Sequence, residues 1–94
     1  MEILKVASSS DPNSVAGAIA GAIEGEGIVE VHSIGAGAVN QAVKAIAIAR
    51  RLIDDEEEKS LVTIPGFIDL EIEGEEKTGI KFVVNFCKDR SKLN

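Results

Sequence analysis

The sequence predicts a single α/β (α+β) domain with the element order β-α-β-α-β-β. Three observations favour this class. Short runs rich in branched residues alternate with two segments of helical periodicity. Two segments with alternating apolar and polar residues then close the chain around a glycine-containing turn, which is typical of a β-hairpin. With 94 residues, of which 45% are hydrophobic, the chain can bury a modest core without disulfides or a metal.

The beginning of the chain predicts a strand, a polar loop and a helix. Residues 2–7 alternate as in a strand, and the loop opens with three serines at 8–10. Asp11 and Pro12 mark a helix start, because the carboxylate can cap free backbone N–H groups and proline fits the first helical position. We expect this helix to run to about Glu24.

Small residues form a second stripe along this helix, at Gly17, Ala20 and Gly21. Glycine inside a helix costs about 1 kcal/mol relative to alanine, so the stripe predicts that another backbone lies close to it. The expected neighbour is the sheet or the second helix, and the alternative is a ligand on the bare face. Gly25 and Gly27 are expected to end the helix.

Residues 28–34 are rich in branched side chains and predict the second strand. Gly35 and Gly37 follow, and glycine adopts backbone angles closed to other residues, so a tight turn is expected there. A helix is predicted from Val39 onward, where strong helix formers occur without further glycine. Its buried face is expected to comprise Val39, Ala42, Val43, Ile46, Ala49 and Ile53.

The turn before this helix is the candidate binding feature. A helix that begins at such a turn points free N–H groups and the positive end of its dipole at one place, which favours an anion. Asn40, Gln41, Lys44 and Arg51 lie within reach on the helix. The alternative is a purely structural turn, since the third glycine of a dinucleotide-binding loop and the Lys-Ser/Thr pair of a P-loop are both absent.

The last part of the chain predicts an antiparallel hairpin. Residues 61–64 form a strand that a Pro-Gly pair interrupts, and it resumes over residues 67–73, where aliphatic and acidic residues alternate. Residues 74–79 are the expected loop, and 80–86 the last strand. The alternation predicts one dry face and one acidic face. The residues expected to be dry or inward are Ile68, Leu70, Ile72, Ile80, Phe82, Val84 and Phe86.

These elements predict one domain over residues 1–87, followed by a polar tail at 88–94. Strand-helix-strand units favour parallel neighbours, whereas the last two strands are antiparallel. Both helices are expected to cover one face of a four-stranded mixed sheet. Ile48 and Leu52 fall off the buried stripe of the second helix, which predicts a homodimer that covers them.

The net charge of −6 disfavours binding of polyanions through bulk charge. The acidic residues are concentrated, however, with five at 54–58 and five more within 69–76. The rest of the chain contains six acidic residues and ten lysines and arginines, so it has a net positive charge and can form a local basic patch.

No catalytic, metal or cofactor site is predicted. His32 is the only histidine, it lies within a strand, and its expected role is structural. The single cysteine cannot form an internal disulfide, and the carboxylates lie in runs that are typical of a solvated face. Neither a membrane-spanning run nor a signal peptide is visible, so a cytoplasmic protein is expected. Because no general base, nucleophile or metal set converges, we also expect that the protein is not an enzyme.

Residues 12–21 and 34–50 resemble two signature stretches of the stage V sporulation protein S family, and residues 64–67 and 73–81 are similar to its third. The resemblance covers about residues 2–86. It implies a bacterial cytoplasmic protein linked to control of sporulation and cell development. It also implies a fold like that of the Alba nucleic-acid-binding proteins, whose subunits form dimers.

In Alba proteins, the loop before the first helix, the start of the second helix and the last hairpin face nucleic acid. The residues that this implies as binding candidates, together with those within reach of the turn, are Ser8, Ser9, Ser10, Asn13, Gly35, Gly37, Asn40, Gln41, Lys44, Arg51 and Lys77. The family often has a lysine where this chain has Ser9, and it often has a basic end of the first helix where this chain has Glu24 and Glu26.

The resulting hypothesis is a non-enzymatic regulatory protein, a homodimer, that contacts DNA or RNA. The competing hypothesis is a homo-oligomeric protein-interaction module without a nucleic-acid role. A continuous positive surface from Ser9 past Lys44 would favour the first, and an acidic or apolar surface would favour the second.

Overall fold

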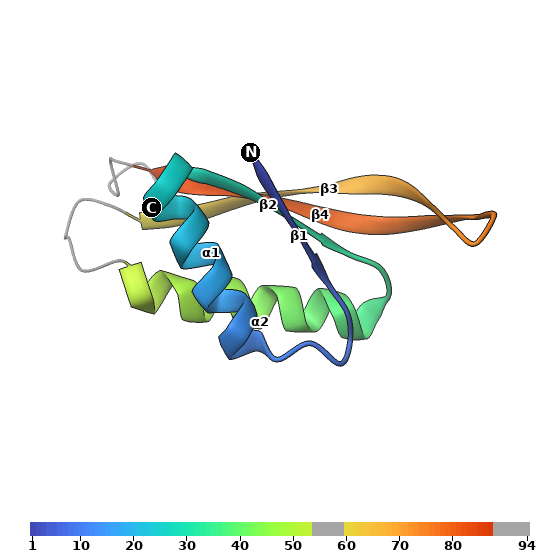
Figure 1. Cartoon of the computed structure of the whole chain (residues 1–94), viewed down its shortest axis with the longest axis horizontal. Helices are drawn as coiled ribbons and strands as arrows, with labels where there is room; N and C mark the ends of the chain where they lie inside the picture. The colour runs from blue at the N-terminus through green and yellow to red at the C-terminus, as the bar shows by residue number, and fades with distance from the viewer. Residues whose placement is uncertain (54–59, 88–94) are drawn as a thin grey trace.

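Six elements occur in the predicted order in the computed structural model, which describes residues 1–53 and 60–87 (Figure 1). The acidic run at 54–58 and the tail at 88–94 lie outside the described residues. The elements are β1 (Glu2–Val6), α1 (Pro12–Glu26), β2 (Ile28–Ser33), α2 (Ala36–Ile53), β3 (Ser60–Ile72) and β4 (Glu75–Cys87).

The four strands form one mixed sheet in the order β1-β2-β4-β3. β1 and β2 are parallel, and β4 runs antiparallel to both of its neighbours, β2 and β3. Both helices cover the same face of the sheet (Figure 1). The predicted fold class is therefore confirmed.

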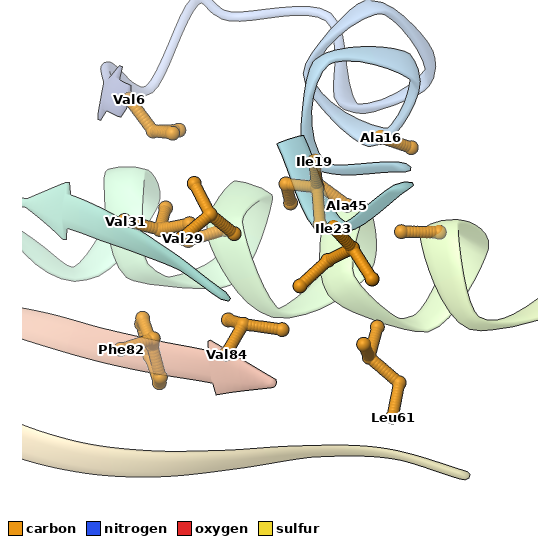
Figure 2. Packing of buried hydrophobic residues seen from close by; sticks show 12 residues of the cluster. Val6, Ala16, Ile19, Ile23, Val29, Val31, Ala45, Leu61, Phe82 and Val84 are labelled. Atoms are coloured by element: carbon orange, nitrogen blue, oxygen red, sulfur yellow. The ribbon is translucent and has the colours of Figure 1, made fainter. Parts of the chain in front are cut away.

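The core lies between this face and the two helices. Ile19 and Ile23 of α1 pack with Ala45 of α2 and with Val29 and Val84 of the sheet (Figure 2). Of these five residues none is more than 3% exposed. The short alanine side chains of α2 allow this helix to lie close to α1 and the sheet. Branched side chains of α1 and the sheet then fill the space between the layers.

The buried face of α2 largely agrees with the predicted one. Ala42 and Ala49 are buried, and Val39, Ile46 and Ile53 pack partly buried against the core. Val43 is the exception, because it is 50% exposed, and Ala38 and Ala45 are buried in addition. The helix also begins three residues earlier than predicted, at Ala36.

Helix α1 departs from its prediction at its glycines. Gly27, with φ 81°, ends the helix and its N–H donates to the Ile23 carbonyl at 2.8 Å, as predicted, but Gly25 lies inside it. A Cβ atom on Gly17 or Gly21 would meet nothing within 4 Å. The prediction of a backbone packed against these glycines is wrong for this chain alone, because they face outward while Ala16 and Ala20 face the core.

The hairpin is longer than predicted. β3 continues through Pro65, which an edge strand tolerates because no neighbour needs its missing N–H. The turn is confined to Glu73 and Gly74, with φ 53° and 81°. β2 pairs with β4 only from Ile80 onward, so residues 67–79 project beyond the sheet as a two-stranded arm (Figure 1). We refer to residues 67–79 as the arm.

The register also corrects the predicted dry face. Directly paired residues of antiparallel strands share a face, and Phe67 pairs with Ile80, which packs on the core. Because successive side chains alternate, Ile68, Leu70 and Ile72 lie on the face away from the helices. Phe82 and Val84 are buried on the helix side, as predicted.

Candidate functional site

The turn into α2 contains two glycines with different roles. Gly35 supplies a backbone conformation that other residues rarely adopt, and Gly37 leaves space for Ser8. Gly35 has φ 92°, and its carbonyl accepts from the Val39 N–H at 3.0 Å, so it immediately precedes the helix. Gly37 lies in the first helical turn without a positive φ. A Cβ atom on Gly37 would lie 2.9 Å from the Ser8 Cβ atom, which is too close for two carbon atoms. The expectation of an unusual backbone angle at Gly37 is therefore wrong.

Two hydrogen bonds shape the first loop, and a third joins it to α2. The Ser10 N–H donates to the Ala7 carbonyl at 3.0 Å, and the Ala7 N–H donates to Ser10 Oγ at 2.9 Å. Gln41 of α2 donates through Nε2 to the Ser10 carbonyl at 2.9 Å. Gln41 is thus a positioning residue, whereas Ser8 and Ser9 remain exposed.

The two helices begin differently. Asp11 caps α1, since its carboxylate accepts from the Asn13 N–H at 3.0 Å and from the Ser14 hydroxyl at 3.2 Å. α2 begins after Gly35, which has no side chain to act as a cap, and its first turn contains no acidic residue. The positive end of the α1 dipole is therefore occupied by a carboxylate, and that of α2 is left to other anions. Asn13 lies exposed at the capped end.

Positive charge extends along α2. Residues 34–53 contain Lys44, Arg50 and Arg51 and no acidic residue. Lys44 and Arg51 are exposed and lie two turns apart on one side of the helix. Lys44 lies about 12 Å from the helix start, beyond the first turn in which the dipole acts. Lys44 therefore lies outside the influence of the helix dipole, and exposed Asn40 lies closer to that end.

The arm carries the opposite charge. Its thirteen residues include five carboxylates and one lysine. That lysine, Lys77, lies 3.2 Å from Glu75 Oε2, and Thr78 donates its hydroxyl to Asp69 Oδ1 at 3.0 Å. The structure brings Lys77 into the arm as predicted, but among acidic neighbours.

The three candidate elements meet around Ser8. The Ser8 side chain packs against Gly37 at the start of α2. Ser8 also lines the same cavity as Leu70 and Ile72 of the arm. The first loop therefore lies between a basic helix and an acidic arm. Basic side chains lie on the α2 side of the loop and carboxylates on the side of the arm.

Gly79 is a structurally important residue that the sequence analysis missed, because it assigned this glycine to the loop. Gly79 is buried in β4, and a Cβ atom there would lie 2.5 Å from the Ser33 carbonyl oxygen and 2.8 Å from Ile34 Cγ1. A glycine inside an alternating strand pattern is the signal of such a close approach. This contact fixes the base of the arm to the end of β2.

No metal or membrane site emerges within the described parts of the chain. Residues 1–53 and 60–87 contain no group of three His, Cys, Asp or Glu side chains placed to hold a metal ion. Over the same residues, no helix is both long and apolar enough to cross a membrane. His32 is buried, and its Nε2 lies 2.7 Å from Glu30 Oε1.

Comparison with known proteins agrees with this architecture. The family model described as stage V sporulation protein S matches residues 2–87. Among solved structures, the chain is similar to Alba from Thermoplasma volcanium, with a TM-score of 0.54 and 18% sequence identity. The match covers 89% of this chain and 96% of the Alba chain, so the two share a fold along nearly their whole length.

Proposed function

The chain belongs to the stage V sporulation protein S family, and we propose from this premise that it is a non-enzymatic cytoplasmic regulator of bacterial development that contacts nucleic acid. The observation that carries the proposal is the surface at which the first loop packs on α2. There, a helix start without an acidic cap adjoins a helix that carries Lys44 and Arg51 on one side and contains no acidic residue.

The proposed contacts are to the phosphate backbone. The N–H groups at the start of α2, together with the amide of Asn40, can donate to one phosphate, and Lys44 and Arg51 can reach others farther along the helix. Exposed Ser8 and Ser9 lie beside the first of these sites. Because the whole chain carries −6, we expect affinity in the range of non-specific binders, with no preference set by base contacts.

A salt titration with duplex DNA and with RNA tests this proposal. Each phosphate contact releases counterions, so the binding constant should fall steeply with salt, and Lys44→Gln or Arg51→Gln should each reduce the slope of the log-log plot by about 1. Lys81→Gln is the matched control, because it removes the same charge from the sheet face away from the helices.

Two results would contradict the proposal. If the wild-type protein binds neither nucleic acid at low salt, the function lies elsewhere. If binding persists in both α2 variants with the slope of the wild type, the nucleic acid occupies another surface. If only Lys81→Gln reduced the slope of the log-log plot, the nucleic acid would contact the sheet face away from the helices.

A homo-oligomeric interaction module is the second candidate, and exposed apolar residues favour it. Phe67 is 79% exposed, Ile64 67% and Leu52 58%, while Ile48 is half-buried. A second copy of the chain that covers part of this apolar surface would account for its exposure. We therefore propose that the protein is a homodimer, and expect sedimentation velocity to give a dimer that Phe67→Ser weakens. A wild-type monomer at the highest soluble concentration would contradict this.

A further inference from the structure

The two edges of the sheet differ in how they are protected against pairing with a further strand. β3 forms one edge, and Pro65 interrupts the row of N–H groups along it. β1 forms the other edge and contains no proline. Within residues 1–53 and 60–87, β1 pairs with β2 alone, so the backbone groups on its outer side are available to another strand.

A groove of about 380 Å³ lies beside this open edge, between β1 and α1. Leu4 of β1 lines it, together with Ala18, Gly21, Ala22 and Gly25 of α1. Apart from the last residue of the helix, every residue that α1 contributes to this lining is glycine or alanine. The helix therefore turns its smallest side chains toward the open edge of the sheet.

The chain by itself does not explain the two glycines of this groove. A Cβ atom on Gly21 or Gly25 would meet nothing within 4 Å, and neither residue has a positive φ. Alanine would therefore fit at both positions, and it favours a helix much more than glycine does. Glycine does allow another backbone to come close. The two glycines are thus explained if a second helix packs against this side of α1.

A second copy of the chain supplies the missing strand and the missing helix together. If β1 pairs antiparallel with β1 of the second copy, a two-fold axis perpendicular to the sheet relates the two chains. Both α1 helices then lie on the same side of the extended sheet and meet along the groove. A foreign peptide that added one strand would pair with β1, but it would bring no helix to cover Gly21 and Gly25.

The charges of β1 select the register of this pairing. Centred on Leu4, the register pairs all five residues of the strand, with Glu2 opposite Val6 and Ile3 opposite Lys5 of the other copy. No two like charges are then opposite each other. A register centred on Glu2 or on Lys5 would place two like charges directly opposite, which is destabilising.

We propose that two copies of the chain associate through their β1 edges into one sheet of eight strands, four from each copy, on which the α1 helices pack at Gly21 and Gly25. α1 has 15 residues and is about 22 Å long, and β1 has 5 residues and is about 17 Å long. Such an interface lies near the lower end for stable complexes, about 1,200 Å² in total, so we expect a Kd in the micromolar range.

This contact is separate from the two surfaces proposed above. Phe67 lies on β3, at the opposite edge of the sheet, and the proposed nucleic-acid contacts lie on α2 and the first loop. The β1 contact therefore rests on neither proposal, and it can be tested at its own residues.

Disulfide cross-linking between two single-cysteine proteins tests the register. Cys87 is the only cysteine, so Cys87→Ser gives a cysteine-free background that receives either Ile3→Cys or Lys5→Cys. In the proposed register these two positions lie opposite each other within disulfide range, whereas two copies of position 3 are too far apart. With oxidised glutathione, the mixture of the two proteins should give about fivefold more cross-linked dimer than either protein alone.

Gly21→Leu, added to both cross-linking proteins, separates the contact from folding. Its side chain meets open space in a single copy, so the midpoint of urea denaturation should rise at low protein concentration. The same side chain blocks the second helix, so the cross-linked yield should fall about fivefold. Ala47→Leu is the control, because it adds the same side chain on the exposed surface of α2, and it should leave the yield unchanged.

Three results would overturn the proposal. The first is an equal yield from the mixture and from either protein alone, which would mean random collision. The second is a yield that Gly21→Leu leaves unchanged. The third is a loss of cross-linking in Phe67→Ser, because the contact would then depend on the other edge of the sheet. An unchanged yield in Phe67→Ser supports the β1 contact even if the homodimer contact at Phe67 fails.

Discussion

Helix α2 and the arm differ in charge and in how the rest of the fold supports them. Residues 34–53 carry three basic residues and no acidic one, whereas the arm carries five carboxylates and one lysine. α2 buries four alanines along the core, while the arm projects from the sheet (Figure 1). The same fold thus presents one basic segment and one acidic segment. Architecture alone does not decide which surface binds.

The prediction with the largest effect concerns Gly79, where the base of the arm contacts the end of β2. Gly79→Ala places a methyl group 2.5 Å from the Ser33 carbonyl oxygen, and backbone on both sides must move. We expect the free energy of unfolding to fall by about 3 kcal/mol, the upper part of the range for overpacking. Urea denaturation measures this change.

Gly66→Ala is the matched control, because it makes the same substitution on the neighbouring strand. A Cβ atom there would lie 3.6 Å from Lys81 Cε, which is ordinary van der Waals contact. We expect a change within about 0.5 kcal/mol. Equal losses in the two variants would show that the close contact at Gly79 is not what fixes the arm.

The anchoring of the first loop on α2 gives the second prediction. Alanine is normally favoured over glycine inside a helix by about 1 kcal/mol, but at Gly37 its methyl group would lie 2.9 Å from Ser8 Cβ. We expect Gly37→Ala to lower the free energy of unfolding by about 1 kcal/mol. In a Ser8→Gly background the contact is gone, so the same substitution should raise it.

The change of sign between the two backgrounds is the decisive observation. Gly37→Val should be worse than Gly37→Ala and worse than Ala36→Val, because Ala36 is exposed at the start of the helix. If Gly37→Ala stabilises the protein with Ser8 in place, the loop moves freely and is not fixed on α2.

The sequence predicts the order of the elements because periodicity and turn residues are local signals. Capping of α1 by Asp11 and termination at Gly27 are local too, and both are confirmed. Burial of Ala38 and Ala45 on α2 could not be predicted, because alanine gives no preference between core and solvent. The contacts of Gly37 with Ser8 and of Gly79 with Ser33 join residues far apart in the chain, so only the fold defines them.

The same reasoning applies to the candidate site. Lys44 and Arg51 share a helix side because they lie seven residues apart, which the helical repeat alone determines. The role of Gln41 in holding Ser10, and the cavity between His32 and the arm, depend on how distant segments pack. The face of Ile68, Leu70 and Ile72 depends on the register of the hairpin, which alternation alone does not set.

Neutralising the arm gives the smallest predicted effect and tests the comparison most directly. Glu71 and Glu76 are paired in the register and share one face, and like charges at such positions are destabilising. The double variant Glu71→Gln with Glu76→Gln should raise the free energy of unfolding by a few tenths of a kcal/mol. It should also strengthen nucleic-acid binding by about twofold at low salt, with the gain vanishing as salt screens the arm.

Glu2→Gln with Glu24→Gln is the control, since it removes two charges from β1 and α1, away from the arm. If the arm lies near the bound nucleic acid, its variant should gain more affinity than this control at the same net charge. Equal gains would mean that only total charge matters and that the arm points away from the phosphates. In that case the acidic arm and exposed Phe67 are better explained as a surface for protein contacts, and α2 alone carries the nucleic-acid proposal.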